Sequence, residues 1–111
     1  MNKETKKIIN DADRILHSLE DGFLRADRDG YIIMANKAIA TMCKYESPEA
    51  MLGMHIKKLY AYPEEREKMI AEIKAKGKLK NYELELLCKD GSRFWSLNNI
   101  KTFFDEEGKL L

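Results

Sequence analysis

Cysteine is scarce in this 111-residue sequence, and its pattern predicts no metal site. Cys43 and Cys88 are the two cysteines, and neither has a second cysteine or a histidine at a spacing typical of zinc ligands. A disulfide framework is not supported either. We therefore expect two reduced thiols that are buried as small hydrophobic side chains.

Long hydrophobic runs and an excess of one charge are also lacking. The first residues, MNKETKK, lead into an amphipathic stretch, which excludes a signal peptide and a membrane span. Twenty basic and nineteen acidic residues leave a net charge of +1. Such a balance predicts no binding to nucleic acid or to an anionic membrane surface. We expect a cytoplasmic protein with no nucleic-acid partner and no direct membrane contact.

The motifs of common enzyme classes are absent. The sequence has no G-x-x-x-x-G-K phosphate loop, no G-x-S-x-G turn and no H-E-x-x-H zinc motif. Glu83 and Glu85 lie on a predicted strand and are expected to face solvent. We expect no catalysis in this chain, so kinase or cyclase activity would belong to an attached effector.

The hydrophobic pattern predicts an amphipathic helix followed by one domain. A hydrophobic content of 44% is enough for a single modest core. Within residues 5–19, apolar side chains recur at helical steps of four and three: Ile8, Ala12, Ile15 and Leu19. This helix either lies across the domain's own sheet or pairs with a second copy in a short coiled coil.

Two predicted hairpins frame a helical centre. Residues 23–27 and 31–35 form the first hairpin, and residues 82–88 and 93–105 form the second. Between them Asn36 is a predicted N-cap, and a helix over residues 64–76 ends at Gly77. This order is typical of an α+β fold, with helices on one face of an antiparallel sheet.

The ordered segments resemble a PAS domain. They are DGFLRADRDGYIIMANKAIATMCKY, EAMLGMHIKKLY and YELELLCKDGSRFWSLNNIKTFFDEEGKLL. The resemblance implies a five-stranded antiparallel sheet with a helical flank around a small-molecule pocket. It divides the chain into an N-terminal helix and linker, residues 1–19, and a PAS domain, residues 20–111.

The resemblance also implies an incomplete last strand. In PAS domains this strand is central, between the first and the penultimate strands, and here it would begin near Leu110. A sheet without it has two unpaired backbone edges, which are costly to bury. We expect the natural chain to continue through this strand into an effector. The alternative is a strand swapped from a second copy.

Two cofactors of PAS relatives do not match this sequence. Flavin photosensors carry a reactive cysteine in the motif that corresponds to residues 53–59, and Ile56 stands in its place. Haem-binding relatives use a histidine on the helix that corresponds to residues 64–76, which contains none. We expect neither cofactor, which leaves a small organic ligand or no ligand. His17 and His55 are expected to be surface or capping residues.

The register of the resemblance assigns the faces of the strand after Asp90-Gly91. Facing the pocket are Phe94, Ser96, Asn98 and Ile100, and facing outward are Trp95, Leu97 and Asn99. A count of apolar residues alone favours the opposite face. Ser96 and Asn98 bond either to nearby backbone or water, or to a ligand.

Two candidate sites follow. The pocket candidates are Leu24, Ala26, Ile39, Met42, Met69, Ile70, Ile73, Leu84, Leu86, Ser96, Asn98 and Ile100. The dimer-interface candidates are Ile8, Ala12, Ile15, Leu19, Trp95 and Leu97. The first set predicts a sensory input module that regulates a downstream effector in the same polypeptide, foremost a histidine kinase of a two-component system. The second predicts a ligand-free homodimerisation module of a diguanylate cyclase or transcriptional regulator.

Overall fold

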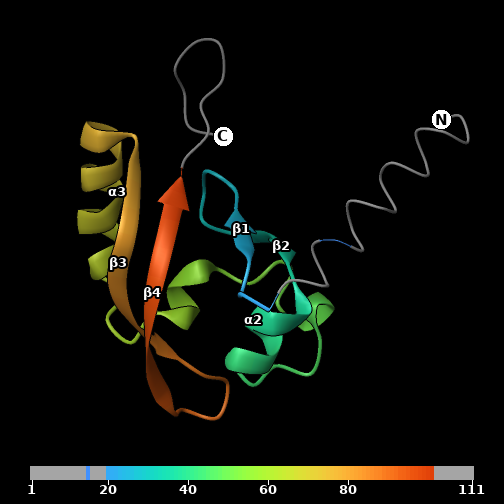
Figure 1. Cartoon of the computed structure of the whole chain (residues 1–111). Coiled ribbons are helices and arrows are strands. Elements are labelled where there is room, and N and C mark those ends of the chain that lie inside the picture. The colour runs from blue at the N-terminus through green and yellow to red at the C-terminus, as the bar shows by residue number, and fades with distance from the viewer. Residues whose placement is uncertain (1–14, 16–19, 102–111) are drawn as a thin grey trace, which may run out of the picture.

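The computed structural model describes residue 15 and residues 20–101, and every structural statement below concerns these residues. Short strands and helices come first and two long strands follow (Figure 1). In chain order they are β1 (Leu24–Ala26), β2 (Ile32–Ala35), α2 (Lys37–Met42), the 3₁₀ helices η1 (Pro48–Ala50) and η2 (Ile56–Leu59), α3 (Glu65–Lys76), β3 (Lys78–Leu87) and β4 (Arg93–Lys101). The expected N-terminal helix lies outside the described residues except for Ile15.

The described strands form two antiparallel pairs. β1 pairs with β2, with Leu24 opposite Ala35. β3 pairs with β4, with Leu86 opposite Phe94. Within residues 20–101, β1 and β4 are not hydrogen-bonded to each other. The expected five-stranded sheet is therefore described only in its first four strands, because its last strand would fall beyond residue 101.

Asn36 fixes the start of α2 and confirms the predicted N-cap. Its Oδ1 accepts hydrogen bonds from the amides of Ile39 (3.0 Å) and Phe23 (2.9 Å). Its Nδ2 donates to the Asp21 carbonyl at 2.9 Å. The side chain is fully buried, so these bonds replace water around an amide that would be costly to bury unpaired. One residue thus holds both the helix start and the approach to β1.

The other helix signals in the sequence also act as predicted. Ser47 caps η1 by accepting a hydrogen bond from the Ala50 amide at 3.2 Å, and Pro48 occupies the first position. α3 ends at Gly77, which has a φ of 81° and donates to the Ile73 carbonyl at 2.6 Å. Local sequence therefore places these helix boundaries without help from the rest of the fold.

Two groups of buried side chains make the core. One joins β2, α2 and η2, and consists of Ile32, Ala35, Ile39, Ala40, Cys43, Met51 and Leu59. The other joins α3 to the inner face of β3, and consists of Tyr60, Met69, Ile73, Leu79, Leu84 and Leu86. Ile56 and Phe94 pack against both groups and so connect them.

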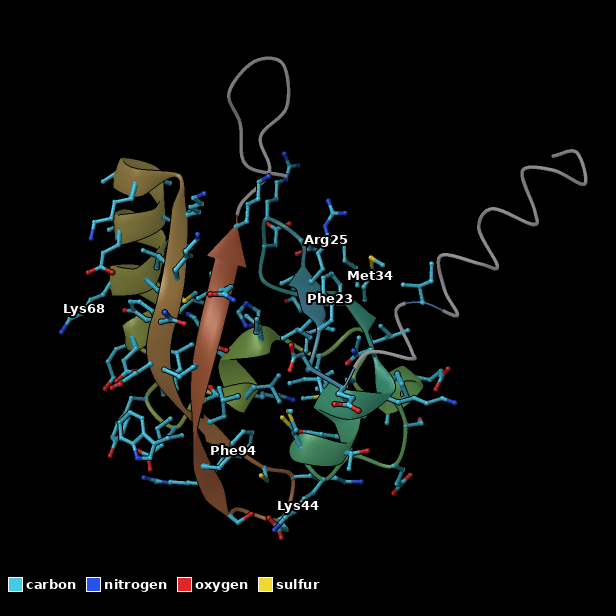
Figure 2. All side chains as sticks on the ribbon, in the orientation of Figure 1. Phe23, Arg25, Met34, Lys44, Lys68 and Phe94 are labelled. Carbon is cyan, nitrogen blue, oxygen red and sulfur yellow. The ribbon has the colours of Figure 1, made fainter. Side chains whose placement is uncertain are left out.

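The two cysteines lie where α2 meets the end of β3. Both are buried and free, which confirms the expected buried thiols. Cys88 Sγ donates to the Met42 carbonyl at 3.4 Å, and the Lys89 amide donates to the Cys43 carbonyl at 2.9 Å. These bonds anchor the end of α2 to the hairpin of β3 and β4, near the labelled Lys44 (Figure 2).

Candidate functional site

A cavity of about 500 Å³ lies between β1, η2, α3 and the inner face of β3 and β4. This volume is within the usual range for small-molecule sites. Its wall is mainly apolar and is formed by Phe23, Leu24, Ala26, Ile39, Ile56, Leu59, Ile70, Leu84, Leu86 and Ile100. Its polar lining residues are Arg25, Asp27, Tyr60, Arg66, Asn98, Asn99 and Lys101.

Most of the predicted pocket residues border this cavity. They are Leu24, Ala26, Ile39, Ile70, Leu84, Leu86, Asn98 and Ile100. Met69 and Ile73 do not, because they are buried between α3 and β3. Met42 does not either: it is the last residue of α2 and is 43% exposed, while Ile39 and Cys43 take the buried side of that turn.

Ser96 also lies away from the cavity wall, within a hydrogen-bond network of the hairpin. Its Oγ donates to the Leu84 carbonyl at 3.1 Å. The Asn98 Nδ2 donates to the Tyr82 carbonyl at 3.0 Å and contacts Ser96 Oγ at 2.9 Å. Because carbonyls only accept, these partners fix the orientation of the Asn98 amide. The Oδ1 of Asn98 meets no hydrogen-bond donor among the described residues, so this oxygen is available as an acceptor.

The two faces of β4 differ in burial as the register of the resemblance predicts, but Asn99, which was expected to face outward, is among the residues that line the cavity. Phe94, Ser96, Asn98 and Ile100 are partly buried, and their neighbours along the strand are exposed. Trp95 and Leu97 are each 68% exposed. A count of apolar side chains alone assigns the faces wrongly here, because the polar inner residues are paired within the hairpin.

Sequence reasoning missed the charged residues of the cavity. Arg25, Asp27, Arg66 and Lys101 all line it. No local pattern marks them, since each lies in a stretch where charged residues are common and expected to be solvated. Ile56 and Leu59 were also missed as lining residues, although the apolar positions of MHIKKLY could have indicated them.

Arg66 occupies a defined place at the start of α3. It is partly buried, and its guanidinium acts on the neighbouring hydroxyl of Tyr60. Burial raises the pKa of Tyr60, and the nearby positive charge of Arg66 opposes that rise. A Cβ on Gly30 would lie 3.2 Å from Arg66 Cζ, so the backbone of the turn before β2 lies directly against the guanidinium.

His55 lies against the same turn before β2 as Arg66 does. Its Nδ1 accepts from the Lys57 amide at 3.2 Å, which makes it a capping residue for η2 as predicted. Its Nε2 lies 2.9 Å from the Asp29 carbonyl, and this tautomer makes Nε2 the donor. Both ring nitrogens therefore make hydrogen bonds within the fold.

Neither cysteine lines the cavity, and the thiol of Cys43 is not activated. Burial, with a smaller contribution from Cys88, raises the pKa of Cys43 to about 11. Ile56, which stands where flavin photosensors carry their cysteine, contributes only an apolar wall.

Over residues 20–101, no cluster of three or more histidine, cysteine or acidic side chains could hold a metal ion. None of the helices described has the length and apolar composition needed to cross a membrane.

The dimer-interface candidates are described only in part. Ile8, Ala12 and Leu19 lie outside the described residues. Ile15 is 62% exposed, and Trp95 and Leu97 project from the outer face of β4.

Comparison with known proteins now identifies the family. A family model for the PAS domain matches residues 20–111. The chain belongs to the PAS domain family. The search of curated proteins found no match. This membership confirms the resemblance seen in the sequence.

Solved structures of PAS domains share the fold. The PAS domain of a Colwellia psychrerythraea protein has a TM-score of 0.78 at 24% identity, with 94% of this chain and 89% of that chain covered. A PAS domain from a two-component sensor histidine kinase has a TM-score of 0.79 at 16% identity, with 93% and 89% covered. The PAS domain of a LuxR-family transcriptional regulator from Burkholderia thailandensis, in complex with ethanol, has a TM-score of 0.61 at 19% identity, with 86% and 77% covered. At these identities the likeness establishes the PAS-like α+β fold.

Proposed function

We propose that this PAS domain is a sensory input module that binds a small organic molecule in its cavity and regulates a downstream effector. The cavity carries the proposal, because it combines a mainly apolar wall with a few convergent polar groups. The effector we favour is a histidine kinase of a two-component system, in the same cytoplasmic polypeptide.

Two of the structural relatives support this choice. One comes from a two-component sensor histidine kinase, and another holds ethanol in its crystal structure. These facts belong to those proteins, and they make a ligand-responsive kinase input a reasonable first hypothesis for this chain.

The cavity is placed where a ligand can alter strand geometry. It touches β1 on one side and the end of β4 on the other. A ligand that binds one arrangement of these strands more tightly than another shifts the population toward it. We propose this shift as the signal passed to the effector.

Native mass spectrometry beside the denatured mass tests the proposal. Protein purified from cells is expected to carry extra mass of a small organic molecule that is released on denaturation. Binding of the released molecule to the stripped protein, and its loss after a bulky substitution such as Ala26→Trp in the cavity wall, would support the sensory role. A bare mass even after incubation with cell extracts would contradict it.

A ligand-free dimerisation module is the second candidate. It is favoured by the two exposed apolar side chains, Trp95 and Leu97, on the outer face of β4, and by the pairing of Ser96 and Asn98 within the hairpin. In this case a homodimer sets the geometry of an attached diguanylate cyclase or transcriptional regulator. A mass of two bare chains in the same experiment would favour it.

A further inference from the structure

More basic than acidic side chains line the largely apolar cavity. Three of its lining residues are basic, Arg25, Arg66 and Lys101, whereas Asp27 is its acidic one. The Asp27 carboxylate is already committed to the turn before β2, since its Oδ1 accepts the amides of Asp29 and Tyr31, both at 2.9 Å. One oxygen of this carboxylate is therefore occupied by backbone amides.

Arg66 is the basic residue whose surroundings are best defined. It is partly buried, and no carboxylate of the described residues lies within ion-pair distance of its guanidinium. Its side-chain neighbour is the hydroxyl of Tyr60, which is neutral. A partly buried cation without a counter-charge is less stable than one with a carboxylate partner, so an anion at this place would be favoured.

Tyr60 and Arg66 together can bind a carboxylate. The guanidinium presents several N–H donors in a plane, and both residues line the cavity. The Tyr60 hydroxyl supplies a further O–H donor. Tyr60 is 5% exposed and Arg66 stands on the first turn of α3, so both donors are held by the core and the helix.

The rest of the cavity sets the shape of the ligand. Leu59, Ile70 and Leu84 belong to the apolar wall beside this corner. A small inorganic anion would leave this wall unfilled, and a neutral hydrocarbon would leave Arg66 without a counter-charge. We infer that the cavity binds an amphipathic organic anion, with its carboxylate beside Arg66 and Tyr60 and its apolar body along the wall. This inference rests on the proposed sensory function and names the chemical class of its ligand.

Isothermal titration calorimetry of the whole chain with three matched probes tests the inference. Octanoate, octan-1-ol and octylamine share one apolar tail and differ in head-group charge. We expect octanoate to bind about tenfold or more tightly than octan-1-ol, since hydrogen bonds to a charged group are stronger than those to a neutral one. Octylamine is expected to bind most weakly.

Substitutions of Arg66 then locate the head group. Arg66→Gln is expected to lower octanoate affinity to that of octan-1-ol and to leave octan-1-ol unchanged, whereas Arg66→Lys retains part of the preference. Lys68→Gln is the matched control, because Lys68 lies on the same helix and points away from the sheet (Figure 2). It should leave all three affinities unchanged. Circular dichroism establishes that each variant is folded.

The outcomes separate this inference from the function on which it rests. Equal affinity for octanoate and octan-1-ol, or an octanoate preference that survives in folded Arg66→Gln, overturns the inference and leaves a ligand-binding cavity in place. Amide NMR shifts at Trp95 and Leu97 in place of Gly30 and Tyr60 also overturn it, because the tail would then occupy the outer face. If none of the probes binds, the anionic ligand is refuted, and the native mass measurement decides the sensory function independently.

Discussion

The Nδ2 of Asn98 lies 2.9 Å from Ser96 Oγ, two residues away on the inner face of β4. The same amide donates to the Tyr82 carbonyl of the paired strand at 3.0 Å. The polarity of this face is therefore largely satisfied by the hairpin itself. What it offers to a ligand is one acceptor, the Asn98 Oδ1.

Asn98→Leu should lower the free energy of unfolding by about 1–2 kcal/mol, because the Tyr82 carbonyl and Ser96 lose a donor. Urea denaturation measures this change. Ser96→Ala, which removes one hydroxyl from the same network, is the comparison and should cost less. In a sensory module Asn98→Leu also alters ligand binding and leaves the oligomeric state as it was. A variant as stable as wild type would mean that these bonds contribute no net stability.

The side-chain amide of Asn36 is expected to contribute more to the free energy of unfolding than an exposed N-cap residue does. Asn36→Ala removes two accepted bonds and one donated bond at a fully buried position, and should cost about 2–3 kcal/mol of unfolding free energy. Ser47→Ala removes the cap of η1 at a less buried site and should cost about 0.5–1 kcal/mol. Equal losses in thermal or urea denaturation would contradict the dual role of Asn36.

Those features that depend on local chemistry were predictable from the sequence. Ser47 and Gly77 mark helix ends through near neighbours in sequence, and so does the bond of Asn36 to the Ile39 amide, whereas the bonds of Asn36 to Asp21 and Phe23 are not local. The alternation of β4 was predictable only with the register of the PAS resemblance. Its exposed Trp95 and half-buried Asn98 reverse the order expected from hydropathy alone.

The cavity was only partly predictable because its lining combines segments that are distant in sequence. Ile39 and Leu84 follow from helix and strand patterns. Arg66 does not, because nothing in a charged helical turn indicates that this cation approaches Tyr60 and Gly30. Met42 was misplaced because the apolar stripe of α2 was extended through the residue where the helix ends. Whether each of these side chains lines the cavity depends on the tertiary fold and not on the local sequence.

Gly30→Ala should lower the free energy of unfolding more than Gly53→Ala. Both glycines have positive φ, 92° and 84°, so alanine is strained at either position by about 1–2 kcal/mol. A Cβ at Gly30 would additionally come within 2.6 Å of the His55 ring, while at Gly53 it meets nothing within 4 Å. The clash should add about 1–3 kcal/mol. Urea denaturation of both variants gives the difference, and equal costs would refute a tight contact at His55.

The outer face of β4 gives a prediction about assembly. If Trp95 and Leu97 lie in a homodimer interface, replacing both with threonine should weaken the dimer at least about thirtyfold, since buried aromatic anchors commonly carry 2 kcal/mol or more. Analytical ultracentrifugation measures the dissociation constant. Lys80→Ser, at an exposed position of β3, is the control, and Ile15→Glu with Leu19→Glu tests the helical stripe. Unchanged dimers in both double variants would place the interface elsewhere.

Alkaline pH should destabilise the protein through Cys43. Its pKa is raised from 9.0 to about 11 in the folded state, chiefly by burial. Because the unfolded chain releases this proton first, the stabilisation is complete below about pH 9 and is lost as pH rises toward 11, on the order of 2–3 kcal/mol in all. Tyr45, Tyr60 and Tyr82 also have raised pKa values and add to the loss of stability at the upper end of this pH range.

Cys43→Ala removes only the cysteine contribution, so its unfolding free energy should start lower at pH 8 and fall less steeply than that of wild type. Parallel curves for the two proteins between pH 8 and 11 would mean that the thiol ionises as easily in the folded state as in the unfolded chain.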